Sequence, residues 1–480
     1  MLLAFVVAYL LATIAIGLWA ARRVKNTADF AVAGRHLPLV MIVTTTFATW
    51  FGSETVLGIP AKFVDGGLKA VVEDPFGSSL CLVLVGVFFA GRLYRMTLLT
   101  ISDYYRERFG RGVEVACSLI IIASYVGWVA AQVTALGLVF NLLSNGAITP
   151  ALGMVIGTVS ILAYTLFGGM WSVAVTDFVQ MIILVVGLSV IAVFAADRAG
   201  GVGEVIAFAA SRDLFNLLPE PSFHGVAFFL GAAVTVMLGS IPQQDVFQRV
   251  MSAKNIEAAT RGPVIGGVCY FLFAFVPMFL VTSALLIMPE AASLLKEDPQ
   301  KVLPTLVMAH MPFVLQVLFF GALLSALKST ASATLLAPSV TFVESIWRQF
   351  QPQMSDRARL TTMRLAVLGF AAIVCGWAIG SQGTPIYDMV AASYQLPLVG
   401  AFVPLVAGLY WNRATTQGGA LSVVMGIGGY LALRGTAAGL AFPAELAGLL
   451  LSAAGMLIGS LGPQAIANRH GAHYRLAGRA

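Results

Sequence analysis

The segment TTTFATWFGSETVLGIP, residues 44–60, decides the fold because it is apolar enough for a membrane yet poor in residues that sustain a helix. Its helical continuity is weakened by two glycines and a proline, Gly52, Gly58 and Pro60. A second apolar segment, VTVMLGSIPQQDVFQRV at residues 234–250, is interrupted in the same way. Interrupted spans at matching places in two halves of a chain indicate an inverted-repeat transporter, although glycine and proline are also common in ordinary membrane helices.

The composition places the whole chain in a bilayer. Of its 480 residues, 59% are hydrophobic and only 10% are charged, whereas soluble domains are about 25% charged. Apolar windows of about 20 residues, each long enough to cross a bilayer, recur throughout and leave no room for a sizeable soluble domain. We therefore expect an all-α, multi-pass integral membrane protein, located in a bacterial inner (plasma) membrane. The apolar run 1–21 is interpreted as a retained first helix rather than a signal peptide.

We expect about thirteen membrane helices, near residues 2–21, 38–61, 75–94, 113–142, 149–167, 172–196, 224–247, 263–288, 312–340, 362–381, 386–411, 417–434 and 443–462. Lys and Arg are concentrated in alternate loops, which predicts an outside N-terminus and an inside C-terminus. The expected organisation is a first helix and loop (1–37), a first inverted repeat (38–196), a second inverted repeat (197–411), two peripheral helices (412–462) and a basic cytoplasmic tail (463–480).

A charged residue at mid-membrane depth marks a second region of interest. The segment SALKSTASATLLAPS, residues 325–339, places Lys328 directly before two hydroxyl residues. At 1.5 Å per helical residue, Lys328 lies roughly 15 Å from the inner end of its span near Pro338, and Ala48 lies roughly 15 Å from Pro38. The broken segment and the hydroxyl pair are therefore expected at the same depth, where carbonyl and hydroxyl oxygens suit a desolvated Na⁺.

Five further segments carry a resemblance to a known family. They are VAGRHLP (32–38), FATWFGSETVLGIP (47–60), LLTISDYYRERFG (98–110), GGMWSVAVTDFVQ (168–180) and DVFQRVMSAKNIEAATRG (245–262). Together they resemble the sodium/solute symporter family, over nearly the whole chain. The resemblance implies a LeuT-like secondary transporter with a five-plus-five inverted-repeat core, discontinuous helices and flanking helices.

The family resemblance also implies two sites. Na⁺ would be held by the carbonyls of Ala48, Phe51 and Ala326 and the hydroxyls of Ser329 and Thr330, with Asp177 near the cytoplasmic exit. A small organic solute, an amino acid or a similar zwitterion or organic acid, would be bound by Trp50, Gly52, Thr55, Asp74, Gln132, Ser240, Tyr394 and Gln395. Packing, helix capping and hydrogen bonding between helices are the alternative roles of these side chains.

Lys328 departs from the family pattern, which has an apolar residue before the hydroxyl pair. Three interpretations are open. The ammonium replaces Na⁺, which would make transport sodium-independent or, if Lys328 deprotonates during the cycle, proton-coupled. It points away and pairs with a carboxylate such as Glu54. Or it extends inward to the membrane surface. Glu54 itself is a candidate for binding a cationic group of the solute, for carrying a proton, or for a hydrogen bond between helices.

Several functional classes are excluded by what the sequence lacks. No phosphate-binding loop precedes Lys328, and no nucleophile–base pair or basic nucleic-acid patch with interleaved aromatics occurs, so we expect neither an enzyme, direct ATP coupling nor a nucleic-acid partner. No cofactor is expected besides Na⁺ or H⁺ as the coupling ion. The four cysteines are interpreted as core residues: Cys81, Cys117, Cys269 and Cys375. The alternative function is a membrane sensor built on a transporter-like core; the sequence defines no oligomeric state.

Overall fold

The computed structural model describes residues 1–466 and confirms the all-α class for that part of the chain. Residues 467–480, most of the predicted basic tail, lie outside the described residues. The first half contains α1 (Leu2–Ala21), α2 (Thr27–Val32), α3 (Leu39–Trp50), α4 (Ile59–Gly66), α5 (Ser78–Leu84), α6 (Ala90–Arg95), α7 (Ile101–Phe109), α8 (Arg111–Leu143), α9 (Pro150–Arg198) and α10 (Val202–Ser211). The second half contains α11 (Phe223–Gly239), α12 (Gln244–Ser252), α13 (Ile256–Ile287), α14 (Ala291–Glu297), α15 (Val302–His310), α16 (Phe313–Thr341), α17 (Asp356–Gly380), α18 (Ile386–Ser393), α19 (Gln395–Pro397), α20 (Val403–Tyr410), α21 (Thr416–Leu433), α22 (Ala437–Ala441) and α23 (Ala444–Leu461).

The number of membrane spans differs from the expected thirteen. Within residues 1–466, nine helices or helical runs are long and apolar enough to cross a membrane, and the bent pair α11 and α12 makes a tenth. The predicted spans 149–167 and 172–196 are joined in α9, whereas α3 and α21 do not meet the same criterion by themselves. The count of thirteen therefore remains a prediction, although every predicted segment is largely helical.

The first predicted break is present. Helix α3 ends at Trp50, Phe51 adopts a non-helical conformation (φ −92°, ψ 66°), and the chain resumes through the π-helical turn η2 (Glu54–Gly58). The freed Ser53 N–H donates to Gln132 Oε1 at 2.8 Å, and the Thr55 hydroxyl donates to the Trp50 carbonyl at 3.1 Å. Because a lipid core offers no water to backbone groups, a break at this depth requires such internal partners.

The second predicted break lies between α11 and α12, whose axes differ by 41°. Downstream of it, the buried Arg249 of α12 reaches across to α3, where its guanidinium donates to the Thr45 carbonyl at 3.2 Å and to the Thr49 hydroxyl. The same group donates to the Asp245 carbonyl at 2.6 Å. The inner part of one interrupted segment is thereby fixed to the inner part of the other.

A third change of direction occurs in α9 at Gly169. Its backbone has φ +46° and ψ −136°, and a β-carbon there would lie 2.3 Å from the Phe30 carbonyl oxygen. Only glycine fits such a close approach at a positive φ without strain. The kink falls between the two spans that the sequence predicts for this region, so their separation corresponds to a bend rather than a loop.

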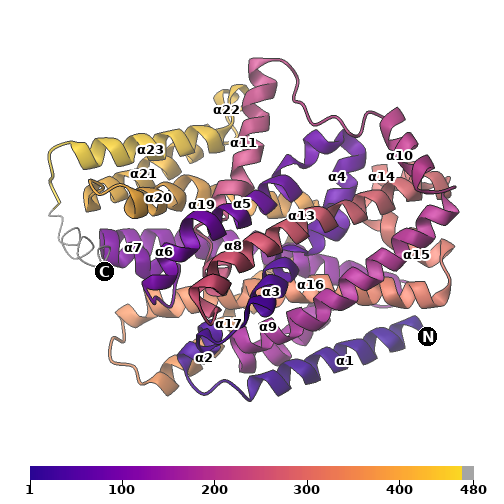
Figure 1. The fold of residues 1–480 in the computed structure, drawn as a ribbon, viewed down its shortest axis with the longest axis horizontal. Helices are drawn as coiled ribbons and strands as arrows, with labels where there is room; N and C mark the ends of the chain where they lie inside the picture. Colours follow the sequence, from indigo (N-terminus) through magenta and orange to yellow (C-terminus); the bar gives the residue numbers. More distant parts are fainter. Residues whose placement is uncertain (467–480) are drawn as a thin grey trace.

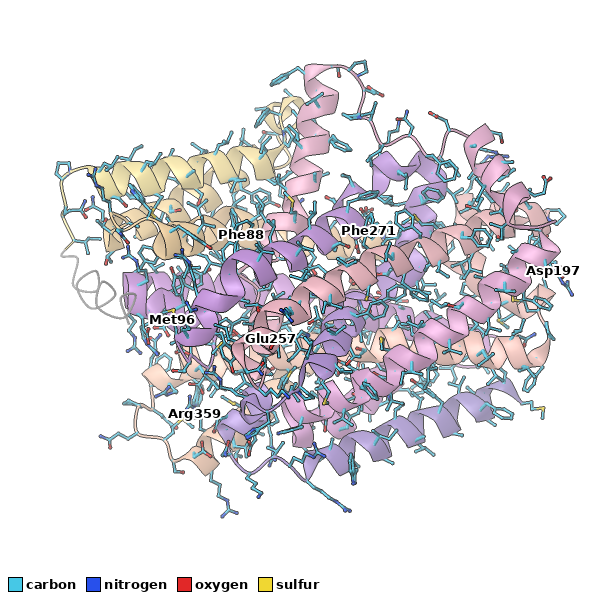
Figure 2. The ribbon with its side chains drawn as sticks, in the orientation of Figure 1. Phe88, Met96, Asp197, Glu257, Phe271 and Arg359 are labelled. Carbon is cyan, nitrogen blue, oxygen red and sulfur yellow. The ribbon has the colours of Figure 1, made fainter. Side chains whose placement is uncertain are left out.

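The helices are arranged so that α16 packs against α3, α8 and α9, which together surround the site (Figure 1). Helix α1 packs on the outside of α9 and α16, while α21 and α23 pair with each other at another edge. Figure 2 places Asp197 at the end of the molecule where α1 begins and Arg359 near the end where α1 finishes. Between these ends, apolar side chains such as Phe88, which is 51% exposed, face outward, as expected of a lipid-facing surface.

Candidate binding sites for an ion and a solute

The broken end of α3 and the middle of α16 meet at the predicted cation site. The Thr330 hydroxyl faces the Ala48 carbonyl at 3.5 Å, and both residues are buried. The other three predicted members, Phe51, Ala326 and Ser329, are also buried. Buried hydroxyl and carbonyl oxygens are the neutral, hard donors that an alkali cation prefers, so these residues fit Na⁺ chemically.

Asp177 adjoins this site on α9. The Ser329 hydroxyl donates to Asp177 Oδ1 at 2.6 Å, and the Thr45 hydroxyl donates to Oδ2. The carboxylate thus contacts hydroxyls of α3 and α16 rather than loop amides, and it also lies within electrostatic range of the Arg249 guanidinium. This contact joins Asp177 to the hydroxyl pair; a role in ion exit remains a prediction.

Lys328 points away from these oxygens. Its Nζ donates to the Thr13 hydroxyl of α1 at 2.7 Å and lies 5.3 Å from the centre of the Tyr164 ring. The residue is fully buried, so the inward-extending interpretation is wrong. The proposed pairing with Glu54 is also wrong, because the Lys328 ammonium is bonded to Thr13 and no ion pair joins it to Glu54 within residues 1–466. The sequence could not reveal this direction, because the partner helix α1 lies outside the predicted repeats.

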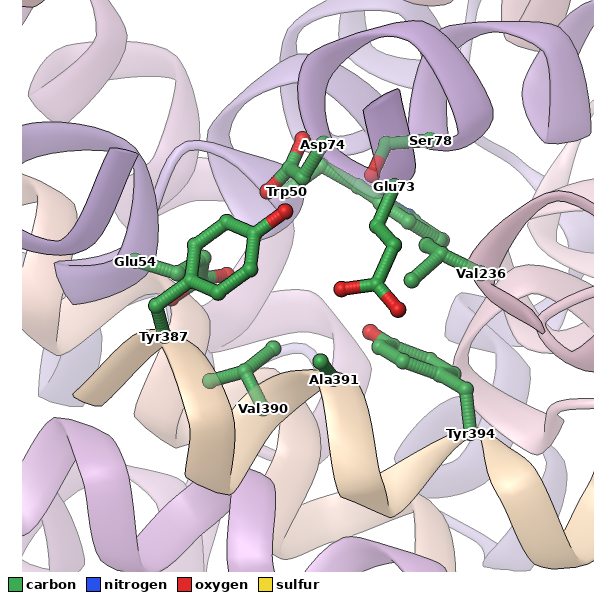
Figure 3. A pocket seen from close by; sticks show the side chains of 10 residues that line it. All are labelled: Trp50, Glu54, Glu73, Asp74, Ser78, Val236, Tyr387, Val390, Ala391 and Tyr394. Atoms are coloured by element: carbon green, nitrogen blue, oxygen red, sulfur yellow. The ribbon is translucent and has the colours of Figure 1, made fainter. Parts of the chain in front are cut away.

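A small cavity lies beside the broken end of α3 (Figure 3). It is enclosed by η2, the π-helical turn η4 (Val72–Gly77), α5, α11 and α18, and it is lined by Trp50, Glu54, Glu73, Asp74, Ser78, Val236, Tyr387, Val390, Ala391 and Tyr394. Its volume is about 10 Å³, room for about one water molecule, so binding of a solute requires these elements to move apart. Three of the predicted solute residues, Trp50, Asp74 and Tyr394, line it, as does Glu54.

The cavity is acidic. Glu54 Oε1 accepts from Trp128 Nε1 at 3.1 Å, and Glu54 Oε2 accepts from Gln132 Nε2 at 2.7 Å. Figure 3 shows the Glu73 carboxylate pointing into the cavity between two tyrosines, and Asp74 is the third acid. The lining includes three carboxyl groups and no lysine, arginine or histidine.

Aromatic rings form another part of the same wall. Trp50 stacks on Tyr394 with ring centres 6.0 Å apart and planes inclined by 12°, and Trp128 lies behind them at 5.4 Å from Tyr394. Tyr387 contributes a further ring. Such π faces attract a cation that has lost its water.

Three predicted solute residues lie behind the lining. Gln132 orients Glu54 and the break at Ser53, as described above, and the Thr55 hydroxyl is bonded to the Tyr270 hydroxyl at 3.0 Å. Gly52 has no side chain, and side-chain oxygens of neighbouring residues occupy the space beside its Cα. These residues support the cavity rather than line it.

Two other predictions for the solute site are not supported. The Ser240 hydroxyl donates to the Val236 carbonyl of its own helix at 2.6 Å. Gln395 Oε1 accepts from the Tyr430 hydroxyl of α21 at 2.5 Å, away from the cavity lining. Each side chain therefore forms its hydrogen bond within its own helix or to a neighbouring helix, which is the alternative role that applies to many polar residues in membranes.

Glu73 and Tyr387 were missed by the sequence reasoning. Glu73 had a signal, since it directly precedes Asp74 at the start of an apolar span, where a second carboxylate is unusual. Tyr387 had none, because a tyrosine near a span end is expected in any membrane protein.

Within the described residues no group of three or more His, Cys, Asp or Glu side chains could hold a metal ion.

The interrupted helices and their packing define the fold class, that of LeuT-like membrane proteins with discontinuous helices. A solved structure of a Na⁺-coupled sialic acid symporter in a substrate-bound outward-open state superimposes with a TM-score of 0.84, 19% identity, and coverage of 96% of this chain and 97% of that chain. MhsT in complex with L-phenylalanine gives a TM-score of 0.58 at 12% identity, covering 89% of this chain and 99% of that chain.

Sequence comparison gives the family. The model described as Sodium:solute symporter family matches residues 30–426, and the chain belongs to that family. High affinity choline transporter 1 of Homo sapiens is 28% identical over 453 residues, which cover 89% of this chain and 75% of the relative. High-affinity proline transporter PutP of Bacillus subtilis is 26% identical over 426 residues, covering 86% and 87%. The chain is a multi-pass integral membrane protein whose relatives are transporters rather than enzymes.

Proposed function

We propose that the protein is a secondary active transporter that imports a small organic solute with a positively charged nitrogen, coupled to Na⁺. One observation carries the choice of solute: the cavity presents three carboxyl groups and several aromatic rings without any basic side chain. A buried carboxylate needs a counter-charge or several hydrogen-bond donors. A cationic solute supplies that charge, whereas an anionic solute would face like-charge repulsion.

The contacts in the cavity support this solute class. Trp128 and Gln132 donate to Glu54 from behind, which fixes its carboxylate at the cavity wall. The stacked rings of Trp50 and Tyr394 provide an adjacent π surface. A carboxylate beside aromatic faces is a suitable environment for an ammonium or quaternary ammonium group. Choline and proline, named for two relatives, both contain such a nitrogen.

The coupling ion is proposed from the second site. Ala48 and Thr330 bring a carbonyl and a hydroxyl together at the break of α3, and the Lys328 ammonium is bonded to Thr13 instead of filling that space. This arrangement favours Na⁺ over the interpretations in which Lys328 replaces the ion or carries a proton. We propose alternating access as the mechanism, and a bacterial plasma membrane remains the predicted location.

Ligand-dependent thermal stability tests the solute class. A solute that binds the folded protein stabilises it by about 2.7 kcal/mol when its concentration is 100 times its Kd. The measurement is made on purified protein in detergent. We expect choline, proline or another amine to raise Tm in the presence of Na⁺, and sialic acid to leave it unchanged. Stabilisation by anionic solutes alone, lost in Glu54→Gln, would contradict the proposal.

A further inference from the structure

Glu54 belongs to both sites. It lines the cavity, where its carboxylate is fixed by α8. It also follows Gly52 by two residues in the broken part of the chain, so it lies at the boundary between the cavity and the oxygens of α16. A single carboxylate at that boundary is positioned to interact with whatever occupies either site.

Three oxygens from three elements converge at Gly52. A β-carbon built on Gly52 would lie 2.5 Å from Glu54 Oε2, 2.8 Å from Thr330 Oγ1 and 2.9 Å from Gln132 Oε1. Because both oxygens are less than 3.0 Å from the position of this β-carbon, the distance between Glu54 Oε2 and Thr330 Oγ1 is at most the sum of the two distances, 2.5 Å and 2.8 Å. The absence of a side chain at Gly52 keeps this corner accessible to the oxygens.

The hydroxyl pair of α16, Ser329 and Thr330, also connects this corner to Asp177. Thr330 faces the Ala48 carbonyl, and its neighbour Ser329 donates to the Asp177 carboxylate. The hydroxyl pair therefore has two carboxylates beside it, Glu54 near Thr330 and Asp177 bonded to Ser329. Of the two carboxylates, Glu54 is the one that also lines the cavity.

We propose that Glu54 is an anionic ligand of the cation site, and that this one carboxylate links ion binding to solute binding. Its charge offsets the repulsion between Na⁺ and a cationic solute held on either side of it. The assignment extends the predicted set of carbonyls and hydroxyls by one charged group. It rests on the proposed function for the solute, but the ion-binding part is independent of which solute is carried.

Sodium binding without solute tests this assignment. The probe is NaCl titrated against KCl at constant ionic strength, with thermal stability of the purified protein as the readout. Glu54→Gln keeps the size of the side chain and removes its charge; we expect the half-saturating Na⁺ concentration to rise at least tenfold, which corresponds to about 1.4 kcal/mol. Asp388→Asn removes an equal charge from the solvent-exposed part of α18, where water and salt screen it, and is expected to change that concentration less than twofold.

A second variant protects the test against misfolding. Gly52→Ala inserts a methyl group among the three oxygens and leaves the charge of Glu54 in place, and we expect it to abolish the Na⁺-dependent stabilisation while the Tm in KCl stays measurable. An unchanged Na⁺ midpoint in Glu54→Gln overturns the assignment, whatever the result for Gly52→Ala. A weakened Na⁺ response in Glu54→Gln together with no stabilisation of the wild type by any amine upholds the ion ligand and rejects the proposed solute class.

Discussion

Replacement of Lys328 by methionine tests the role of a fully buried ammonium group. Its contacts are the hydroxyl of Thr13 and the ring of Tyr164. Among residues 1–466, Lys328 forms no ion pair with a carboxylate. Lys328→Met keeps the unbranched side chain and deletes the charge. Because the ammonium points to Thr13 of α1, we expect the cation site to survive this change.

The magnitude follows from two opposing terms. The variant loses a charge-assisted hydrogen bond, worth about 1.5–3 kcal/mol, but no longer buries an ammonium, whose effective desolvation costs several kcal/mol. Folding stability should therefore stay the same or increase. With Nζ on the order of 10 Å from the hydroxyl pair and an effective dielectric constant of about 20, repulsion toward Na⁺ amounts to about 1.7 kcal/mol. Removing it should lower the Na⁺ concentration for half-maximal uptake by roughly tenfold or slightly more.

The assay is solute uptake by wild type and Lys328→Met in liposomes, measured at a series of external Na⁺ concentrations. Thr13→Val is the matched control, because it removes the partner of the ammonium and leaves the charge in place. We expect Na⁺-dependent uptake in all three proteins, with the lower Na⁺ requirement confined to Lys328→Met.

Two results would refute this reasoning. If uptake by the wild type is independent of Na⁺ and becomes Na⁺-dependent in Lys328→Met, the Lys328 ammonium takes the place of Na⁺ in the transport cycle. Wild-type uptake that follows a proton gradient and disappears in Lys328→Met would make Lys328 the proton carrier.

Three further variants test other parts of the structure. Arg249→Ala removes the buried guanidinium that joins α12 to α3 and leaves Asp245 buried without it, so we expect a loss of about 3–5 kcal/mol in unfolding free energy, visible as a lower Tm; an unchanged Tm would show that the contact is dispensable. Asp177→Asn keeps the hydrogen-bonded shape beside the hydroxyl pair without its charge, and it should raise the Na⁺ requirement for uptake several-fold; an unaltered Na⁺ dependence would separate Asp177 from the ion. Gly169→Ala forces a β-carbon against the Phe30 carbonyl at a positive φ, at a cost on the order of 1–3 kcal/mol, and wild-type stability of this variant would disprove the strain.

The breaks, and the shared depth of the broken segment and the hydroxyl pair, were accessible to sequence reasoning because they depend on local chemistry. Glycine and proline in the segment 44–60 predict where the helix must end, and counting residues from each membrane boundary brought Ala48 and Thr330 to one depth. The structure places these two residues together. Helix positions and the apolar spans follow from the same period and length rules, although the spans predicted at 149–167 and 172–196 are joined by a kink at Gly169.

Side-chain direction was not accessible in the same way. Lys328 and Ser329 are adjacent in sequence, yet one contacts α1 and the other contacts Asp177, because neighbours on a helix point about 100° apart. Which helix lies on each side depends on tertiary packing. For the same reason Gln395 was assigned to the cavity but bonds Tyr430, whereas Glu73 was overlooked and points into it.

The central claim is tested most directly by accumulation of a labelled cationic solute in liposomes that contain the purified protein. An inward Na⁺ gradient and an inward proton gradient are imposed separately, with the membrane potential clamped in both cases. Our account predicts accumulation above the external concentration with the Na⁺ gradient, none with the proton gradient, and loss of accumulation when Thr330→Val removes a hydroxyl from the cation site. Accumulation driven by protons, or equal uptake with and without Na⁺, would contradict it.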